Sequence, residues 1–296
     1  MTLRIGTRGS ALALAQANHV AGLLAVDTEI VEIRTSGDAG ERRSDKSRWV
    51  KEIEEALLAQ EIDLAVHSAK DVPGELPEGL GIVGVPRRED ARDALVGAES
   101  LDALPEGARV GTSSLRRRSQ LLAVRPDLDV HDLRGNVDTR LRRLEEGRFD
   151  AIVVALAGLR RLGRDEGAEP LPAAKLTPAP GQGCLALEAR RDDERVAELA
   201  AAVTDREALV RLTAERALVE RLEATCHTPV GAYAELGDDG LLLGAFVGMP
   251  DGASWIRDAA VADPGEPAAL GAAVGERLIA AGASELLAAA EVAAIG

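Results

Sequence analysis

One apolar run of the chain ends in a close group of polar and ionisable side chains: His67, Ser68, Lys70 and Asp71. The run itself, Ile62 to Val66, is mostly branched and apolar, as a buried parallel strand requires. Pro73 then prevents a helix from running back through the turn. The four polar side chains are therefore predicted at the carboxyl end of a strand, where open α/β sheets bind ligands. Taken alone, Lys70 beside Asp71 fits a solvated surface pair equally well.

Other predicted strands also end in hydroxyl and arginine side chains. They are Leu3 to Gly6 before Thr7, Arg8 and Ser10; Ala108 to Gly111 before Thr112, Ser113, Ser114 and Arg116 to Arg118; Asp129 to Leu133 before Arg134 and Arg140; and Asp150 to Ala155 before Arg160 and Arg161. These strand ends lead into predicted helices, whose free N–H groups and dipole favour anions. The guanidinium fork of arginine matches a carboxylate two bonds at a time. The pattern predicts a ligand with several carboxylates, although Arg116 to Arg118 alone would fit a solvated helix face.

The overall charge makes this concentration of arginine unusual. The chain of 296 residues has a formal net charge of −15 at pH 7, and its only lysines are Lys46, Lys51, Lys70 and Lys175. So acidic a balance argues against nucleic acid or an anionic membrane as a partner, because phosphate binding needs a basic footprint. An acidic, lysine-poor surface is instead expected of a protein adapted to high salt.

Composition also limits the fold and the cofactors. Aromatic residues make up 2% of the chain, so aliphatic residues must build the core, which favours helices packed on a parallel sheet. The apolar run from Leu12 to Leu24 is too short to cross a bilayer, and we expect a cytoplasmic protein that is monomeric by default. Cys184 and Cys226 make no disulfide framework, and the four scattered histidines have no metal-ligand spacing, so no metal is expected.

The order of predicted elements indicates two α/β domains followed by an α+β domain. The elements expected in the first domain are strands at 3–6, 26–34, 62–66 and 80–85, helices at about 11–24 and 49–59, and a charged segment at 39–48 that fits a lid. The second domain repeats this plan from residue 108 and ends in a Pro- and Gly-rich hinge at 178–183. A strand at 185–189 is expected to return to the first sheet.

The third domain follows a change of periodicity. An amphipathic helix is predicted from 205 to about 223, and a further helix begins at about 267. Between them, an antiparallel meander is predicted over 232–236, 241–247 and 253–261. The predicted domain limits are 1–86 with 184–203, then 87–183, then 204–296.

Asp71 and Cys226 are the strongest candidates for chemistry. Set among cations, Asp71 should stay ionised, because nearby positive charge favours the carboxylate, and it could stabilise a cationic intermediate. Cys226 lies in a predicted loop, where a reactive thiol and a small buried cysteine fit about equally well. Cys184, inside an apolar strand, fits a buried cysteine better, and His67 fits a hydrogen-bonded structural residue better than a general base.

Six motifs together resemble the porphobilinogen deaminase family, also called hydroxymethylbilane synthases. They are Thr7-Arg8-Gly9-Ser10 with Leu12-Ala13-Leu14, Val66 to Pro73, Gly111 to Arg117, Leu133 to Val137, Pro178 to Gly183, and Cys226-His227-Thr228-Pro229. The resemblance covers nearly the whole chain, and the joint order and spacing are specific although each motif alone is weak.

The resemblance implies two doubly wound domains like those of type II periplasmic binding proteins, a C-terminal α+β domain, and an active site in the cleft between the first two. It implies condensation of four porphobilinogen molecules head to tail, with release of ammonia at each step, and hydrolytic release of the linear tetrapyrrole hydroxymethylbilane. Each pyrrole carries an acetate and a propionate, which accounts for the arginines. By the match at Cys226, this thiol should carry a thioether-linked dipyrromethane cofactor that primes the chain and is not turned over.

The resemblance also assigns roles to single residues. Asp71 should hold pyrrole N–H groups and stabilise the azafulvenium cation that forms when ammonia leaves. The positions matching cofactor binding are Ser68, Lys70, Thr112, Ser114, Arg116, Arg117 and Arg140. Those matching contacts to substrate or the growing chain are Arg8, Ser10, Arg134, Arg161 and Gln182. Trp49 would stack over the pyrroles from the lid, with ordinary core packing as its alternative.

A two-lobed binding protein for a polycarboxylate is the main alternative function. The cleft and the arginines alone would allow it, but a binding protein has no use for a loop thiol directed at the cleft. Cys226 therefore favours the enzyme.

Overall fold

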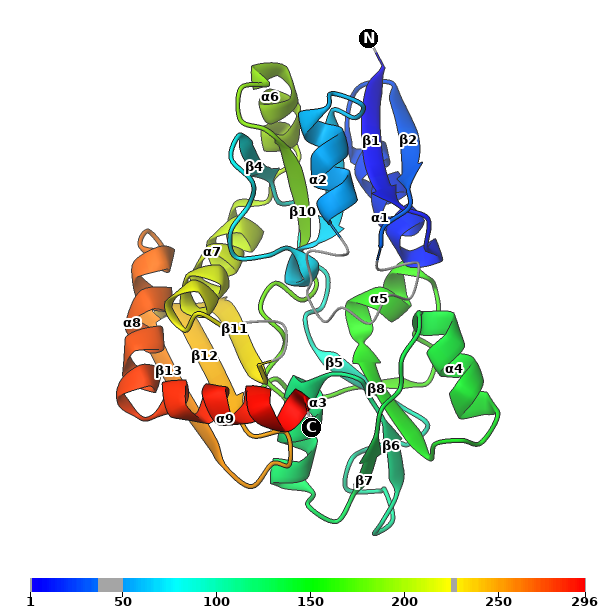
Figure 1. Ribbon diagram of the computed structural model, residues 1–296, viewed down its shortest axis with the longest axis vertical. Coiled ribbons are helices and arrows are strands. Elements are labelled where there is room, and N and C mark those ends of the chain that lie inside the picture. Colours follow the sequence, from blue (N-terminus) through cyan, green and yellow to red (C-terminus); the bar gives the residue numbers. More distant parts are fainter. Residues whose placement is uncertain (1, 37–49, 225–227, 296) are drawn as a thin grey trace. The chain divides into compact units, whose positions relative to one another are not determined.

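The computed structural model of the protein describes residues 2–36, 50–224 and 228–295 (Figure 1). The chain divides into two compact units, Met1–Glu89 with Gly183–Val210, and Asp90–Gln182 with Arg211–Gly296. The predicted lid at 39–48, Trp49 and Cys226 lie outside the described residues. Within the described ranges, no helix is both long and apolar enough to span a membrane.

The first unit contains a five-stranded mixed sheet of order β2-β1-β3-β10-β4. Its strands are β1 (Leu3–Arg8), β2 (Thr28–Ile33), β3 (Leu64–Ser68), β4 (Leu80–Gly84) and β10 (Leu185–Arg190). β1 runs parallel to both β2 and β3, whereas β10 runs antiparallel to β3 and β4. The prediction that the strand after the hinge returns to the first sheet is confirmed.

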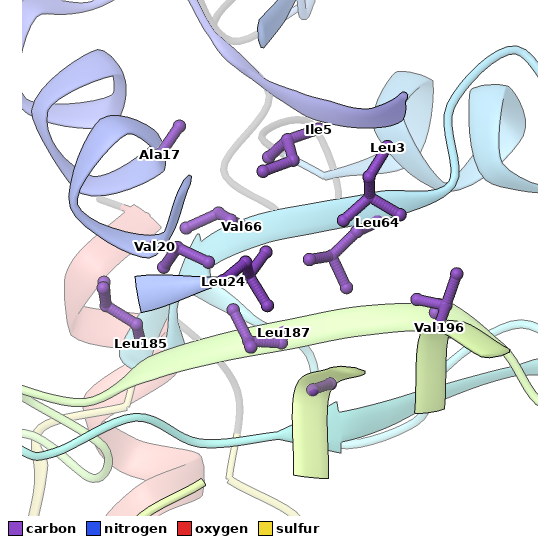
Figure 2. Close-up of a cluster of buried hydrophobic side chains, with 12 residues drawn as sticks. Leu3, Ile5, Ala17, Val20, Leu24, Leu64, Val66, Leu185, Leu187 and Val196 are labelled. Carbon is purple, nitrogen blue, oxygen red and sulfur yellow. The ribbon is translucent and has the colours of Figure 1, made fainter. Parts of the chain in front are cut away.

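Both faces of this sheet are covered by helices, which are α1 (Ala11–Leu23), α2 (Lys51–Leu58) and α6 (Glu194–Ala202). On one face, strand side chains such as Leu64 and Leu187 pack with Val20 of α1 and Val196 of α6 (Figure 2). On the other, Ala65 of β3 packs with the buried residues of α2. Alternate residues of a strand point to opposite faces, so His67 lies on the face covered by α2.

The second unit contains a similar mixed sheet of order β7-β6-β8-β5-β9. Its strands are β5 (Asp93–Val96), β6 (Arg109–Gly111), β7 (Asp129–His131), β8 (Ala151–Ala155) and β9 (Ala168–Pro170). β6 is parallel to β7 and β8, and β5 is antiparallel to β8 and β9. The helices that follow its parallel strands are α3 (Leu115–Val124), α4 (Val137–Glu145) and α5 (Leu156–Arg161). Its core consists of two hydrophobic clusters. One contains Val110 and Val153, and the other contains Ile152 and Val154.

An antiparallel meander forms the third sheet, with the order β11-β12-β13. Its elements are β11 (Val230–Gly237), β12 (Gly240–Gly248) and β13 (Trp255–Ala262), with α8 (Pro267–Ala280) and α9 (Ala283–Ile295) packed against it and α7 (Arg206–Arg221) preceding it. Gly240 has a φ of +126°, which suits the tight turn between β11 and β12. The predicted fold class, two α/β domains and a C-terminal α+β domain, is confirmed, and the domain limits stay a prediction.

Candidate active site

In the first unit, Asp71 sits in a short turn just beyond the carboxyl end of β3. Ser68 ends the strand, and a single 3-10 turn, Ala69–Asp71, carries Lys70 and Asp71. The Ala69 N–H donates to the Cys184 carbonyl oxygen at 3.0 Å, which ties the turn to the chain entering β10. Asp71 is half-buried, and none of the described residues makes a hydrogen bond or an ion pair with its carboxylate. A cationic group can therefore meet this carboxylate without displacing a partner that belongs to the described residues.

Arg8 and Ser10 lie at the same edge of the first sheet, because β1 and β3 are parallel. Arg8 ends β1, and Ser10 is the N-cap of α1, where its side chain accepts a hydrogen bond from the Ala13 N–H at 3.3 Å. The structure thus places Arg8, Ser10, Ser68, Lys70 and Asp71 at one sheet edge, whereas Trp49 lies outside the described residues.

In the second unit, β6 delivers Thr112 and Ser114 to the start of α3. Ser114 is the N-cap and accepts from the Arg117 N–H at 3.4 Å, and its own N–H donates to the Thr112 hydroxyl at 3.3 Å. Both hydroxyls are thereby fixed beside the free N–H groups of a helix N-terminus, where the dipole favours anions.

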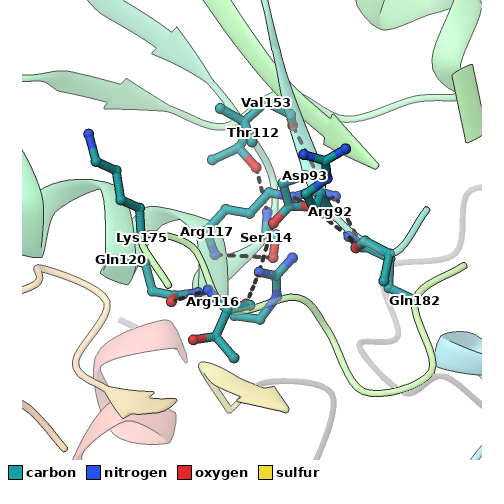
Figure 3. A network of polar contacts seen from close by, with 12 residues as sticks. Arg92, Asp93, Thr112, Ser114, Arg116, Arg117, Gln120, Val153, Lys175 and Gln182 are labelled. Carbon is teal, nitrogen blue, oxygen red and sulfur yellow. Dashed lines mark hydrogen bonds and ion pairs between the residues drawn. The ribbon is translucent and has the colours of Figure 1, made fainter. Parts of the chain in front are cut away.

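Arg116 and Arg117 converge on one buried carboxylate, that of Asp93 (Figure 3). Arg116 Nη1 lies 2.8 Å from Asp93 Oδ2, and Arg117 Nη2 lies 2.8 Å from Oδ1. All three residues are buried, with Asp93 0% exposed and each arginine 5% exposed. The alternative of a solvated helix face for Arg116 to Arg118 is therefore wrong for the first two.

The electrostatics of this group leave it with one excess positive charge. Burial alone would raise the pKa of Asp93, but the two guanidinium groups outweigh it and hold the pKa of that carboxyl below its usual range. Burial also lowers the pKa of Arg116, opposed by the charge of Asp93. Because two cations face one carboxylate, the net positive charge of the group favours binding of a further anion.

Gln182 belongs to the same group. Its Nε2 donates to the Ala91 carbonyl oxygen at 2.7 Å and to Asp93 Oδ1 at 2.8 Å, and the residue is 1% exposed. The buried amide thus helps to position Asp93, and the expectation that Gln182 contacts substrate stays a prediction.

The other predicted site arginines of the second unit, Arg134, Arg140 and Arg161, are more exposed than Arg116 and Arg117. Arg140 Nε donates to the Gly135 carbonyl oxygen at 2.8 Å, and its Nη2 to the Ser113 hydroxyl at 3.3 Å, so it lies against the loop after β6. Arg134 is exposed and pairs with Asp132 at 2.6 Å. Arg161 ends α5, which follows β8. Since β6, β7 and β8 are parallel, these residues follow neighbouring strands at one edge of the sheet.

Glu215 of α7 is a buried residue that sequence reasoning did not single out. Its Oε2 accepts from the Gly181 N–H at 2.7 Å and its Oε1 from the Ala234 N–H at 2.8 Å. It thus ties the hinge, next to Gln182, to β11 of the third sheet.

Replacing Glu215 by glutamine should lower the free energy of unfolding by about 1–3 kcal/mol, because an amide has one acceptor oxygen and a buried N–H loses its partner. Urea denaturation measures the change. Glu220, exposed on the same helix, supplies the control Glu220→Gln, expected within about 0.5 kcal/mol of wild type. Equal stability of the two variants would contradict this role of Glu215.

His67 is buried in a second polar cluster, beneath α2. Its Nε2 lies 3.0 Å from Oε2 of Glu188, whose side chain is buried, and Glu54 of α2 is close enough to interact electrostatically with both. Burial, followed by the charge of Glu188, raises the pKa of Glu54 to about 7. The interpretation of His67 as a structural residue agrees with this environment.

Glu54→Gln should make the protein more resistant to unfolding at pH 8 but not at pH 4. The folded-state pKa of Glu54 lies above its ordinary value of 4.5, so its stabilising contribution is complete below about pH 4.5 and is lost as pH rises through about 7. Glutamine cannot ionise and keeps that contribution, worth about 2 kcal/mol. Urea midpoints at several pH values measure the difference, and a variant with the same pH dependence as wild type would contradict it.

Cys184 is fully buried, as expected, and Cys226 and Trp49, which fall outside the described ranges, have no structural description. Among the residues that the structure describes, no group of three or more His, Cys, Asp or Glu side chains could hold a metal ion.

Two family models match the chain. Residues 3–198 match the model described as porphobilinogen deaminase, dipyromethane cofactor binding domain, and residues 209–280 match the porphobilinogen deaminase C-terminal domain. A porphobilinogen deaminase from Deinococcus radiodurans is 48% identical over 305 residues, covering 97% of this chain and 98% of that protein.

Solved structures similar to the chain include periplasmic binding proteins. An arginine-specific one from Salmonella typhimurium has a TM-score of 0.40 at 14% identity, covering 70% of this chain and 93% of that chain. The Bordetella pertussis BvgS periplasmic VFT2 domain also has a TM-score of 0.40, at 17% identity, covering 68% of this chain and 86% of that one.

Proposed function

The chain belongs to the porphobilinogen deaminase family, and from this premise we propose which of its residues serve each part of the reaction. The enzyme joins porphobilinogen molecules head to tail into hydroxymethylbilane and releases ammonia, primed by a dipyrromethane cofactor. The alternative function was a polycarboxylate-binding protein, and periplasmic binding proteins resemble this chain in fold only.

The buried arginine pair is the observation that carries the assignment of the cofactor site. The acetate and propionate groups of dipyrromethane are anions, and Arg116 and Arg117 exceed their one carboxylate partner, Asp93, by one charge. Hydroxyl and backbone donors at the start of α3 complete a donor set that suits carboxylates. The residues present therefore fit the group.

The residues assigned to holding the cofactor are Thr112, Ser114, Arg116, Arg117 and Arg140 in the second unit and Ser68 and Lys70 in the first. When bound, the cofactor supplies the nucleophilic pyrrole to which the first substrate is joined. Cys226 attaches it through a thioether, which the match of Cys226-His227-Thr228-Pro229 to the family motif supports.

Asp71 is the catalytic residue of the proposal. Loss of ammonia from the substrate leaves a cation, and a fixed carboxylate stabilises charge where it develops. The half-buried position of Asp71 and its lack of a partner among the described residues support this role.

The carboxylates of incoming substrate and of the growing chain are bound by Arg8, Ser10, Arg134 and Arg161. The places of these residues at the strand ends of the two sheets support this assignment. The resemblance to the family alone supports a role for Trp49 in stacking over the pyrroles.

We also propose that the enzyme is a cytoplasmic monomer without a nucleic-acid or membrane partner, in an organism with an acidic proteome. The formal net charge of −15 supports the lack of polyanionic partners and the acidic proteome. Light scattering of the purified protein in low and high salt tests the monomer.

Intact-mass spectrometry with peptide mapping tests the assignment of Cys226. The wild-type protein should carry an added mass equal to two linked substrate-derived pyrroles on Cys226. Cys226→Ser should lack the adduct and release no ammonia from porphobilinogen, whereas Cys184→Ser, which changes the other cysteine, should keep both. An adduct on Cys184, or full turnover by Cys226→Ser, would overturn the attachment site.

A further inference from the structure

The proposed reaction gives no part to the buried cluster of Glu54, His67 and Glu188. These residues are 7%, 5% and 0% exposed and come from α2, β3 and β10. In the antiparallel pairing of β3 with β10, His67 lies opposite Ala186 and Glu188 lies opposite Ala65. His67 and Glu188 are therefore diagonal neighbours on the sheet face that α2 covers.

The cluster must hold at least one proton. A ring nitrogen and a carboxylate oxygen 3.0 Å apart repel each other unless one of them is protonated. Neither His67 Nε2 nor the two carboxylate oxygens of Glu188 has an aligned hydrogen bond in the described part of the chain. Two buried carboxylates cannot both stay ionised at low cost without a cation beside them, which agrees with the raised pKa of Glu54.

The other charged groups on this side of the sheet are bound elsewhere or are nearer the surface. They are Lys51, Glu52 and Glu55 on α2, Glu29 on β2, Arg4 and Arg8 on β1, and Arg190 on β10, while β4 carries no titratable side chain. Arg4 pairs with Asp63, and Arg190 donates to the carbonyl oxygens of Leu57 and Ile62. Within the described residues, His67 is the group at ion-pair distance from Glu188, and Glu54 interacts electrostatically with both.

This contact lies directly before the turn that carries Asp71. One residue, Ser68, separates His67 from the 3-10 turn, and the backbone of that turn is already tied to β10 through Ala69 and Cys184. The end of β3 is therefore attached to β10 at two places, at His67 through Glu188 and at Ala69 through the Cys184 carbonyl oxygen. We propose that Glu188 is a positioning residue for Asp71, which holds the His67 ring and thereby fixes the end of β3 from which the Asp71 turn starts. The inference rests on the catalytic role proposed for Asp71.

Kinetics of ammonia release by the cofactor-loaded enzyme test the proposal. Glu188→Gln keeps the size of the side chain but removes its charge, and should lower kcat by about 10- to 100-fold with KM within about twofold, because a small misplacement of a catalytic group slows chemistry. Glu54→Gln, which removes a different buried carboxylate from the same cluster, should keep kcat within about twofold at pH 6. Intact mass confirms that each variant carries the cofactor.

A double-mutant cycle shows whether Glu188 acts through His67. If it does, the variant with both Glu188→Gln and His67→Gln should be no slower than the slower single variant. Additive losses, or an unchanged kcat in Glu188→Gln, would overturn the proposal. If Glu188→Gln does not fold, His67→Gln alone decides, with the same expected loss of kcat at unchanged KM.

Asp71→Asn, measured alongside, separates the two proposals. Full turnover by Asp71→Asn would remove the catalytic role of Asp71 itself. An inactive Asp71→Asn together with a normal Glu188→Gln would overturn only the positioning role of Glu188.

Discussion

Asp93→Asn should lower the free energy of unfolding by about 3–5 kcal/mol, because it leaves two buried guanidinium groups without their carboxylate. The amide has nearly the shape of the carboxylate, so the loss reports charge and not packing. Urea denaturation at pH 7 measures it. The cofactor-loaded fraction should fall as well, since Arg116 and Arg117 lose the residue that holds them in place.

The pH dependence of the Asp93→Asn effect follows from the lowered pKa of Asp93. A carboxyl whose folded-state pKa is lowered stabilises the fold above its unfolded value, here 3.8, and loses this contribution as pH falls through the folded-state pKa. The difference between wild type and variant should thus be complete above about pH 4 and shrink only in stronger acid.

Asp132→Asn is the matched control for Asp93→Asn. Asp132 also pairs with an arginine, Arg134, but their side chains are 53% and 80% exposed. An exposed pair contributes at most about 1 kcal/mol. A loss of similar size in both variants would contradict the special weight given to the buried group.

Asp71→Asn should reduce turnover by about 10²- to 10³-fold while the fold and the arginine pair stay unchanged, because the amide has no charge to stabilise the cation left by ammonia. Ammonia release under single-turnover conditions measures the step directly. The matched control is Glu75→Gln, which changes an exposed carboxylate in the same loop and should keep wild-type turnover. Near-normal ammonia release by Asp71→Asn would refute the electrostatic role.

Local pattern was enough to predict the strand ends of the candidate site. The apolar run before His67 is β3, the hydroxyls after Gly111 cap α3, and the strand after the hinge joins the first sheet. In each case a few neighbouring residues carry the signal, because apolar runs, capping residues and glycines determine locally where strands end and helices begin.

The partners of those residues could not be predicted in the same way. Asp93 begins β5, a strand of four residues that follows a charged stretch, so no periodicity marks it. Its pairing with Arg116 and Arg117 depends on β5 lying antiparallel beside β8, which brings together residues far apart in the chain. Glu215 and Glu188 likewise resemble ordinary helix and strand residues until their buried partners are known.

The position of β10 has a consequence for the order of events during synthesis of the protein. β10 lies between β3 and β4, although 100 residues separate Leu185 from Val85, the residue just after β4. While the ribosome is still translating the second sheet, β3 and β4 therefore have no strand between them and expose unpaired edges. The first sheet can close only after the whole of residues 90–182 has been made, so early folding of the first unit is delayed by the chain inserted in it.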